Sequence, residues 1–255
     1  MFRKRERFER CDVPKPGPLR NVFAVVVLIV CLVSFGILCS KSWYKANQLN
    51  GLNSEELDDA LYEQVDPTEP TGGRVWSDDD FSNVQIFLVD DINAEQPELK
   101  AAQIFVYDST AEKATIVDLP INMKVWLKDS TSTLPIQFAE GGAEQALPFV
   151  TSADNVHVSH VIVASESFWD QVSSFKGSAF SAMFSDQTDD FATMTSDFDL
   201  ADLLEFSERV QKIGYENIEH LNPPTWPETM PDGSEVSVVD WQELPTQLGI
   251  FVYPE

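Results

Sequence analysis

The hydrophobic residues of this chain change their pattern along its length. The first pattern is an uncharged run from Asn21 to Ser40, in which Val22–Cys39 is almost wholly apolar. At about 1.5 Å of rise per residue, a helix of this length comes close to the roughly 30 Å hydrocarbon core of a bilayer. A helix also satisfies its own backbone hydrogen bonds in lipid. The run therefore predicts a transmembrane helix over residues 21–40.

The charges on either side of this run predict its orientation. Residues 1–20 hold seven of the 17 Lys and Arg residues and three of the 42 Asp and Glu residues. Short basic segments stay on the cytoplasmic side, so this arm is expected inside and the rest of the chain outside the cell. A cleaved signal peptide is disfavoured, because its apolar stretch is usually about 7–15 residues and ends at small residues, unlike Ile37-Leu38-Cys39. A lipoprotein anchor at Cys39 is disfavoured because bulky Leu38 precedes it.

Beyond residue 83, short apolar runs alternate with amphipathic segments. The short runs are rich in Val, Ile and Phe, and they predict strands at 84–89, 103–107, 114–119, 124–127, 156–163 and 236–239. The amphipathic segments predict helices at 143–151, 166–176, 199–213 and 240–248. Strands alternating with helices indicate an α/β fold, a mixed sheet with flanking helices. We predict one extracellular domain over residues 81–255, preceded by an acidic stalk, residues 41–80, with a short helix over 54–64.

The charge balance and the cysteines narrow the range of functions. Residues 21–255 carry the remaining 10 basic and 39 acidic side chains. Such acidity argues against nucleic acid as a partner, because its phosphates would be repelled. The three cysteines, Cys11, Cys31 and Cys39, all lie in or before the apolar run. The predicted extracellular part therefore contains no disulfide and no thiol chemistry.

Four segments carry a further signal through their order and spacing. They are Ile86–Asn93, Lys100–Ile104, Asp118–Asn122 and Phe138–Gly142. In this order they resemble four motifs of the LytR–CpsA–Psr family, namely Gly-x-Asp-x-Arg, Arg-Ser-Asp-Thr-Ile, Ser-Ile-Pro-Arg-Asp and Ala-Tyr-x-x-Gly-Gly. The resemblance implies a single-pass membrane protein with an extracellular α/β domain in the bacterial cell envelope.

The resemblance also implies a reaction. Active members transfer a phosphoglycosyl group from a polyprenyl-pyrophosphate carrier to the cell wall, with arginines holding the pyrophosphate and aspartates holding Mg²⁺ or assisting. Such chemistry depends mostly on positioning and electrostatic stabilisation. Replacing the charged residues is therefore expected to remove the activity.

This chain departs from the family at the positions that carry that chemistry. Asn93 stands at the arginine of the first motif. The second motif has Lys100 for its arginine and Ala102 for its aspartate, and the third has Ile121 and Asn122. Lys100 keeps a positive charge without the bidentate fork of arginine. These positions predict that the grip on a pyrophosphate is weakened or lost.

The remaining polar candidates are two acids and two lysines. Asp90 and Asp91 follow the predicted strand 84–89 and are candidate Mg²⁺ ligands, because Mg²⁺ prefers oxygen donors. The alternative is that both are solvated charges at a strand end. Lys100 and Lys124 are candidate ligand-binding residues, with a solvated surface as the alternative for Lys124.

Three functions stay open at this point. The first is a non-catalytic domain that binds polyprenyl-phosphate lipids or regulates cell-wall enzymes. The second is an active glycopolymer phosphotransferase, in which lysines gather around a metal at Asp90 and Asp91. The third is a structural ectodomain that binds a protein through exposed tryptophans, with Trp126, Trp169 and Trp226 as candidates. Loss of charge at the phosphate positions favours the first and the third.

Overall fold

The computed structural model describes residues 55–94, 96–165, 194–198, 200–214 and 217–254. All of these residues belong to one compact unit, Gln48–Glu255. The predicted cytoplasmic arm, transmembrane helix 21–40 and helix 166–176 lie outside the described residues. Within the described part, no helix combines the length and the hydrophobicity that a membrane span requires.

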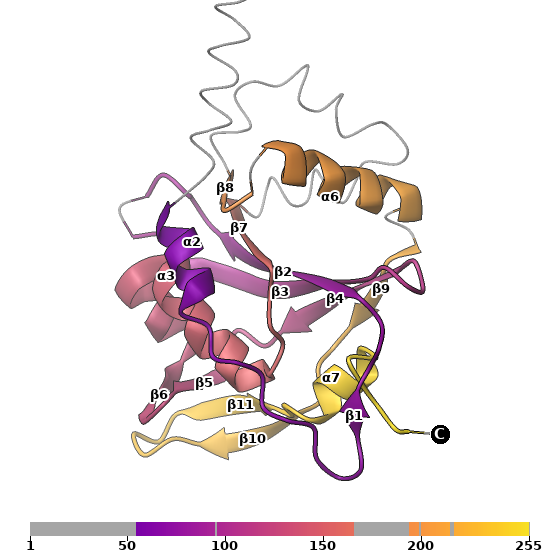
Figure 1. Ribbon diagram of the computed structural model, residues 1–255. Helices are drawn as coiled ribbons and strands as arrows, with labels where there is room; N and C mark the ends of the chain where they lie inside the picture. The colour runs from indigo at the N-terminus through magenta and orange to yellow at the C-terminus, as the bar shows by residue number, and fades with distance from the viewer. Residues whose placement is uncertain (1–54, 95, 166–193, 199, 215–216, 255) are drawn as a thin grey trace, which may run out of the picture. The chain divides into compact units, whose positions relative to one another are not determined.

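A six-stranded mixed sheet forms the centre of the domain (Figure 1), with the strand order β8-β7-β2-β3-β4-β9. The strands are β2 (Phe81–Val89), β3 (Leu99–Asp108), β4 (Lys113–Leu119), β7 (His160–Ser165), β8 (Met194–Ser196) and β9 (Glu219–Leu221). β2 is antiparallel to β3 and parallel to β7, and β4 is antiparallel to β3 and parallel to β9. The prediction of an α/β fold with a mixed sheet is therefore confirmed.

Helices cover both faces of this sheet. On one face, α2 (Glu55–Tyr62) and α3 (Leu134–Asp154) contribute to a core that contains Phe87 and Leu147. On the other face, Phe206 of α6 (Leu200–Ile213) packs against a second core around Ile86. Residues 83–89 of β2 are consequently all buried. This burial explains why β2 has a nearly continuous apolar run instead of an alternating pattern.

α3 consists of two helical segments joined at Gly141 and Gly142. The backbone of Gly142 has φ +66° and ψ −155°, a conformation that is essentially restricted to glycine. A Cβ on Gly141 would lie 2.6 Å from the Cβ of Gln145. The predicted helix 143–151 is the second segment, and it continues past Pro148 to the end of α3.

Two ribbons of two strands each lie beneath α3 in Figure 1. They are β5 (Lys124–Leu127) with β6 (Ser130–Thr133), and β10 (Thr225–Thr229) with β11 (Glu235–Val239). A parallel bridge between Met123 and Ser237 joins the two ribbons. Both β5 and β11 contact α3, so their inner faces close the core from below.

The described part of the predicted stalk is not free but lies against the domain. In α2, Leu57 and Ala60 are buried in the core beside α3. Residues 63–77, which we call the strap, follow α2 and continue to the start of the sheet. Three side-chain amides, one in the strap and two in the rest of the domain, fasten the strap, and each of them both accepts a hydrogen bond from a backbone N–H and donates one to a backbone C=O.

Two of these amides act near the end of α3. The Gln64 amide donates to the C=O of Val158 at 3.1 Å and accepts from its N–H at 3.1 Å. The Asn155 amide donates to the C=O of Thr68 at 3.1 Å and accepts from its N–H. The predicted strand 156–163 begins only at His160, because these side-chain bonds occupy part of the preceding backbone.

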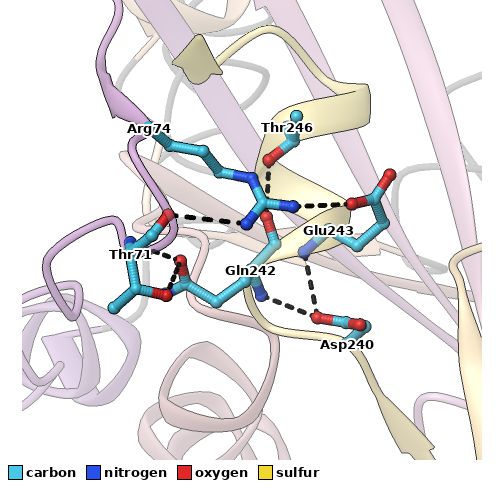
Figure 2. Close-up of polar contacts among 6 residues, drawn as sticks. All are labelled: Thr71, Arg74, Asp240, Gln242, Glu243 and Thr246. Carbon is cyan, nitrogen blue, oxygen red and sulfur yellow. Dashed lines mark hydrogen bonds and ion pairs between the residues drawn. The ribbon is translucent and has the colours of Figure 1, made fainter. Parts of the chain in front are cut away.

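The third amide belongs to Gln242, just before α7 (Glu243–Gln247), and Figure 2 shows its surroundings. Its Oε1 accepts from the N–H and the hydroxyl of Thr71 at 2.8 and 3.1 Å. Beside it, Arg74 forms an ion pair with Glu243 at 2.9 Å. The strap then pairs as β1 (Val75–Trp76) with β12 (Phe251–Val252). The strap is therefore fastened along its length to two separate parts of the domain.

Candidate functional site at one end of the central sheet

The candidate site lies where β2, β4 and β7 end and β3 begins. The register places Val89 beside Leu99 and Ser165, and Leu119 beside Ala102. The segments that follow β2 and β4 therefore leave the sheet at the same end. The positions that the sequence points to at this end are Asp90, Asp91, Asn93, Lys100, Ala102, Ile121 and Asn122.

Asp90 and Asp91 organise the loop that follows β2. Oδ1 of Asp90 accepts hydrogen bonds from the backbone N–H groups of Asp91 and Glu98, both at 2.8 Å. Oδ1 of Asp91 accepts from the N–H of Asn93 at 2.9 Å. The bond from Glu98, then that from Asp91, and the nearby charge of Lys100 lower the pKa of Asp90. The Asp90 carboxylate thus closes its own loop.

Lys100 lies at an irregularity of β3. The β2–β3 register shifts by one residue between Leu88 and Val89, which makes Lys100 the extra residue of a β-bulge. Its ammonium group forms an ion pair with Glu98 at 2.9 Å. Such exposed pairs contribute about 0–1 kcal/mol, so this pair is weak, but an incoming anion would have to compete with it.

The other family-equivalent positions are neutral and differ in burial. Ala102 is 1 % exposed and packs in the core. Ile121, directly after Pro120, is 41 % exposed. Asn122 binds β11, since its Oδ1 accepts from the Ser237 hydroxyl at 3.1 Å and its C=O accepts from the Ser237 N–H at 3.2 Å. None of these three side chains supplies a charge to an anionic ligand.

Lys124 belongs to a different part of the domain. It lies on β5, and its Nζ forms an ion pair with Glu228 of β10 at 2.7 Å. The two candidate lysines therefore make separate ion pairs, Lys100 at the end of the central sheet and Lys124 across the ribbons. Lys100 therefore lies beside the loop of Asp90 and Asp91, whereas Lys124 lies on the ribbons and does not contribute to this site.

The residues at the sheet end fit a divalent cation poorly. Asp90 and Asp91 each use one carboxylate oxygen to hold backbone N–H groups. Among the described residues, no group of three His, Cys, Asp or Glu side chains is arranged to hold a metal ion. Mg²⁺ requires a near-octahedral shell of oxygen ligands, and we derive no metal-dependent step from these residues.

A polar row on the α6 side of the sheet is not evident from sequence. Gln103 of β3 donates from Nε2 to Oδ1 of Asp118 in β4 at 2.5 Å. The other oxygen of Asp118 lies 3.6 Å from Nδ1 of His220 in β9. The one available signal is a polar residue, Asp118, inside the apolar strand 114–119. The partners of Asp118 come from other strands, so they can be identified only when the order of the strands in the sheet is known.

A second histidine pair lies at the opposite end of the sheet, beside Val84. Nδ1 of His160 is 2.6 Å from Oδ2 of Asp197, and the imidazole stacks on Phe198 with the ring centroids 4.0 Å apart. Oδ1 of Asp197 also accepts from the N–H of Val161 at 2.6 Å. This pair fixes β8 to β7 and takes no part in the candidate site.

Comparisons with known proteins agree with this architecture. No model of a known protein family matches the sequence, and no curated protein matches it. The fold, however, is that of the LytR–CPS2A–Psr proteins, as the sequence motifs suggest.

Three solved structures illustrate the likeness. TagV from B. subtilis is 8 % identical, with a TM-score of 0.50 over 66 % of this chain and 95 % of that chain. TagT bound to LIIa-WTA is 10 % identical, with a TM-score of 0.49 over 67 % and 92 %. The LytR-CPS2A-psr family protein YwtF (TagT) with bound octaprenyl pyrophosphate lipid is 12 % identical, with a TM-score of 0.47 over 72 % and 98 %. At these identities the likeness concerns the fold.

Proposed function

We propose that this chain is a single-pass membrane protein of the cell envelope whose extracellular LytR–CPS2A–Psr-like domain has a non-catalytic role. In this role it binds lipid-linked glycopolymer intermediates weakly or regulates cell-wall enzymes. The uncharged run over residues 21–40, the basic arm before it and the acidic domain after it support the location. The fold supports a place in glycopolymer biology, since TagT has been solved with LIIa-WTA and with octaprenyl pyrophosphate.

One observation carries the non-catalytic part of the proposal. At this end of the sheet, the described charged side chains of Asp90, Asp91 and Lys100 are engaged within the domain. Asp90 closes its own loop, Lys100 pairs with Glu98, and Ala102 is buried. Among the residues that the structure describes, a pyrophosphate placed here would meet one engaged lysine instead of several arginines. Transition-state stabilisation of phosphoryl transfer would therefore be largely absent.

A transfer assay tests this proposal. The full-length protein in detergent is mixed with a glycan on a polyprenyl-pyrophosphate carrier and with a cell-wall acceptor, and TagT serves as the active reference. We expect transfer by TagT and none above background by this protein. The matched variants are Lys100→Ala at the candidate site and Lys113→Ala at the far end of β4, both of which remove an exposed lysine.

The two variants separate the competing functions. Transfer that is present in the wild type and in K113A but lost in K100A would show an active phosphotransferase and contradict the proposal. Binding of octaprenyl pyrophosphate without transfer would support lipid handling. Absence of both binding and transfer would leave regulation of envelope enzymes as the remaining form of the proposed role.

A further inference from the structure

The two ribbons beneath α3 share one outer face. Met123 and Ser237 are bridged, so the next residues, Lys124 and Val238, lie beside each other on the opposite face. Trp226 pairs with Val238 and is on that face as well. We call this surface the platform, and define it as the outer face of β5, β6, β10 and β11.

The ion pair across the ribbons supports this register. Lys124 reaches Glu228, which pairs with Val236 two residues before Val238. On β5, side chains two residues apart share a face, so Trp126 is on the same side of the ribbon as Lys124, where it is partly buried and also packs against the first core. The platform therefore carries the exposed Trp226 and the partly buried Trp126, both on the same side of the Lys124–Glu228 ion pair.

Two buried valines lie beneath the platform. Val236 and Val238 are 2 % and 5 % exposed, yet neither belongs to the two cores that pack against the central sheet. They are covered from the outer side, where Trp226 and the Lys124–Glu228 pair lie. Trp226 is 43 % exposed, so part of its ring meets solvent. The indole ring of Trp226 is thus partly exposed and rests on the buried side chain of Val238.

The platform also supplies hydroxyl groups. Thr131 of β6 pairs with Trp126, and Thr133 pairs with Lys124, so both threonines are on the outer face. The outer face then combines aromatic rings with hydroxyl, ammonium and carboxylate groups at their edges. The C–H groups of a sugar ring carry partial positive charge and stack on the electron-rich face of an aromatic ring, while its hydroxyls bond neighbouring polar groups.

From this arrangement we infer that the platform binds a neutral oligosaccharide, with Trp226 and Trp126 stacking on its sugar rings and the Lys124–Glu228 pair bonding its hydroxyls. The platform is distinct from the end of the central sheet, and this inference does not rest on the proposed function. Lys124 and Glu228 neutralise each other at 2.7 Å, so the platform offers no net charge to an ionic partner. The net charge of −25 disfavours an anionic polymer in addition.

The edge strand argues against a protein strand as the occupant. β10 lies at the edge of the ribbons and contains Pro227 in its middle. Proline has no N–H to donate, and a proline with a neighbouring charge is a typical protection of an edge against strand addition. The face of β10 remains available for stacking, while its edge is protected.

Titration of the full-length protein with tetra-N-acetylchitotetraose tests the inference. The protein is kept in a zwitterionic detergent without a sugar headgroup, and binding is followed by calorimetry. The variants are Trp226→Phe, which keeps a stacking face, and Trp226→Leu, which keeps Val238 covered without a ring. Trp76→Leu is the matched control, because Trp76 is 39 % exposed but lies on β1, outside the platform.

We expect the wild type, W226F and W76L to bind the oligosaccharide, and W226L to bind about tenfold more weakly, which corresponds to about 1.4 kcal/mol. An equal loss in W76L would overturn the inference, as would wild-type protein that shows no heat of binding at millimolar sugar. Glu228→Ala gives a second measurement if W226L unfolds, because Glu228 is exposed and its removal takes away a group proposed to bond the sugar hydroxyls, so E228A is expected to weaken binding with the fold retained. Unchanged binding in E228A together with an unfolded W226L would also count against the platform.

Discussion

The buried carboxyl of Asp154 leads to the sharpest prediction about folding stability. Asp154 lies at the end of α3 and is 0 % exposed. Its Oδ1 accepts from the N–H of Val156 at 2.9 Å, and its Oδ2 has no hydrogen-bond partner among the described residues. Burial raises the pKa of this carboxyl from 3.8 to about 8. The folded protein therefore keeps the Asp154 proton at neutral pH.

This pKa shift makes stability depend on pH with a defined sign. Between pH 3.8 and about 8 the folded state holds a proton that the unfolded state releases, so the free energy of unfolding falls as pH rises. The slope for one such group is about 1.4 kcal/mol per pH unit. Asp154→Asn removes this titration and keeps an oxygen that can accept the N–H of Val156. The free energy of unfolding of D154N relative to that of the wild type should therefore rise by about 3 kcal/mol between about pH 5 and about pH 7.

Urea unfolding of residues 48–255 at these two pH values measures the difference. Asp232→Asn is the control, because Asp232 also accepts a backbone N–H two residues ahead, but it is exposed. Hydrogen bonds from the hydroxyl and then the N–H of Ser234 lower the pKa of Asp232, so this carboxyl stays ionised at both pH values and the difference between D232N and the wild type should be constant. The reasoning is refuted if the difference between D154N and the wild type is the same at both pH values.

Three further predictions concern the backbone and the loops. Gly142→Ala should lower the free energy of unfolding by about 1–3 kcal/mol, because φ +66° with ψ −155° is strained for alanine, and an unchanged thermal midpoint would contradict this. Gln242→Ala should speed hydrogen exchange at the N–H of Thr71, which loses its acceptor, and unchanged exchange there would show that the amide does not hold the strap. Asp90→Asn should destabilise the domain at neutral pH, because the lowered pKa of Asp90 stabilises the folded state fully above pH 3.8, and the loss should shrink as pH falls from 3.8 through the lower pKa of the folded state; a loss that does not change with pH would argue against this role.

Four strands of the central sheet, β2, β3, β4 and β7, could be predicted because burial on both faces leaves them largely apolar, whereas the three-residue strands β8 and β9 were not predicted. The predicted strand 114–119 differs from β4 by one residue, and in the ribbons the predicted strand 124–127 has the observed bounds of β5. β10 could not be predicted in this way, because all five of its residues are exposed and show no apolar period. The strap has the polar composition of a stalk, and its hydrogen bonds come from side-chain amides that leave no hydrophobic pattern.

The candidate site was predictable only as a set of positions. Motif order placed Asp90, Lys100 and Ile121 near one another, and the sheet register brings them to the same end. The ion pair of Lys124 could not be predicted, because it depends on a contact between residues far apart in sequence. Lys124 pairs with Glu228, 104 residues away, and nothing in the local sequence of either residue indicates the other.

The strap also has a consequence for the order in which the protein is made. Thr71 binds Gln242, which is 171 residues further along the chain, and β1 pairs with residues that follow α7. During synthesis the strap is translated long before these partners exist. Contacts of such separation form slowly, since loop closure must precede them. Residues 71–77 therefore stay exposed on the nascent chain, where chaperones and proteases can reach them until α7 and β12 have been added.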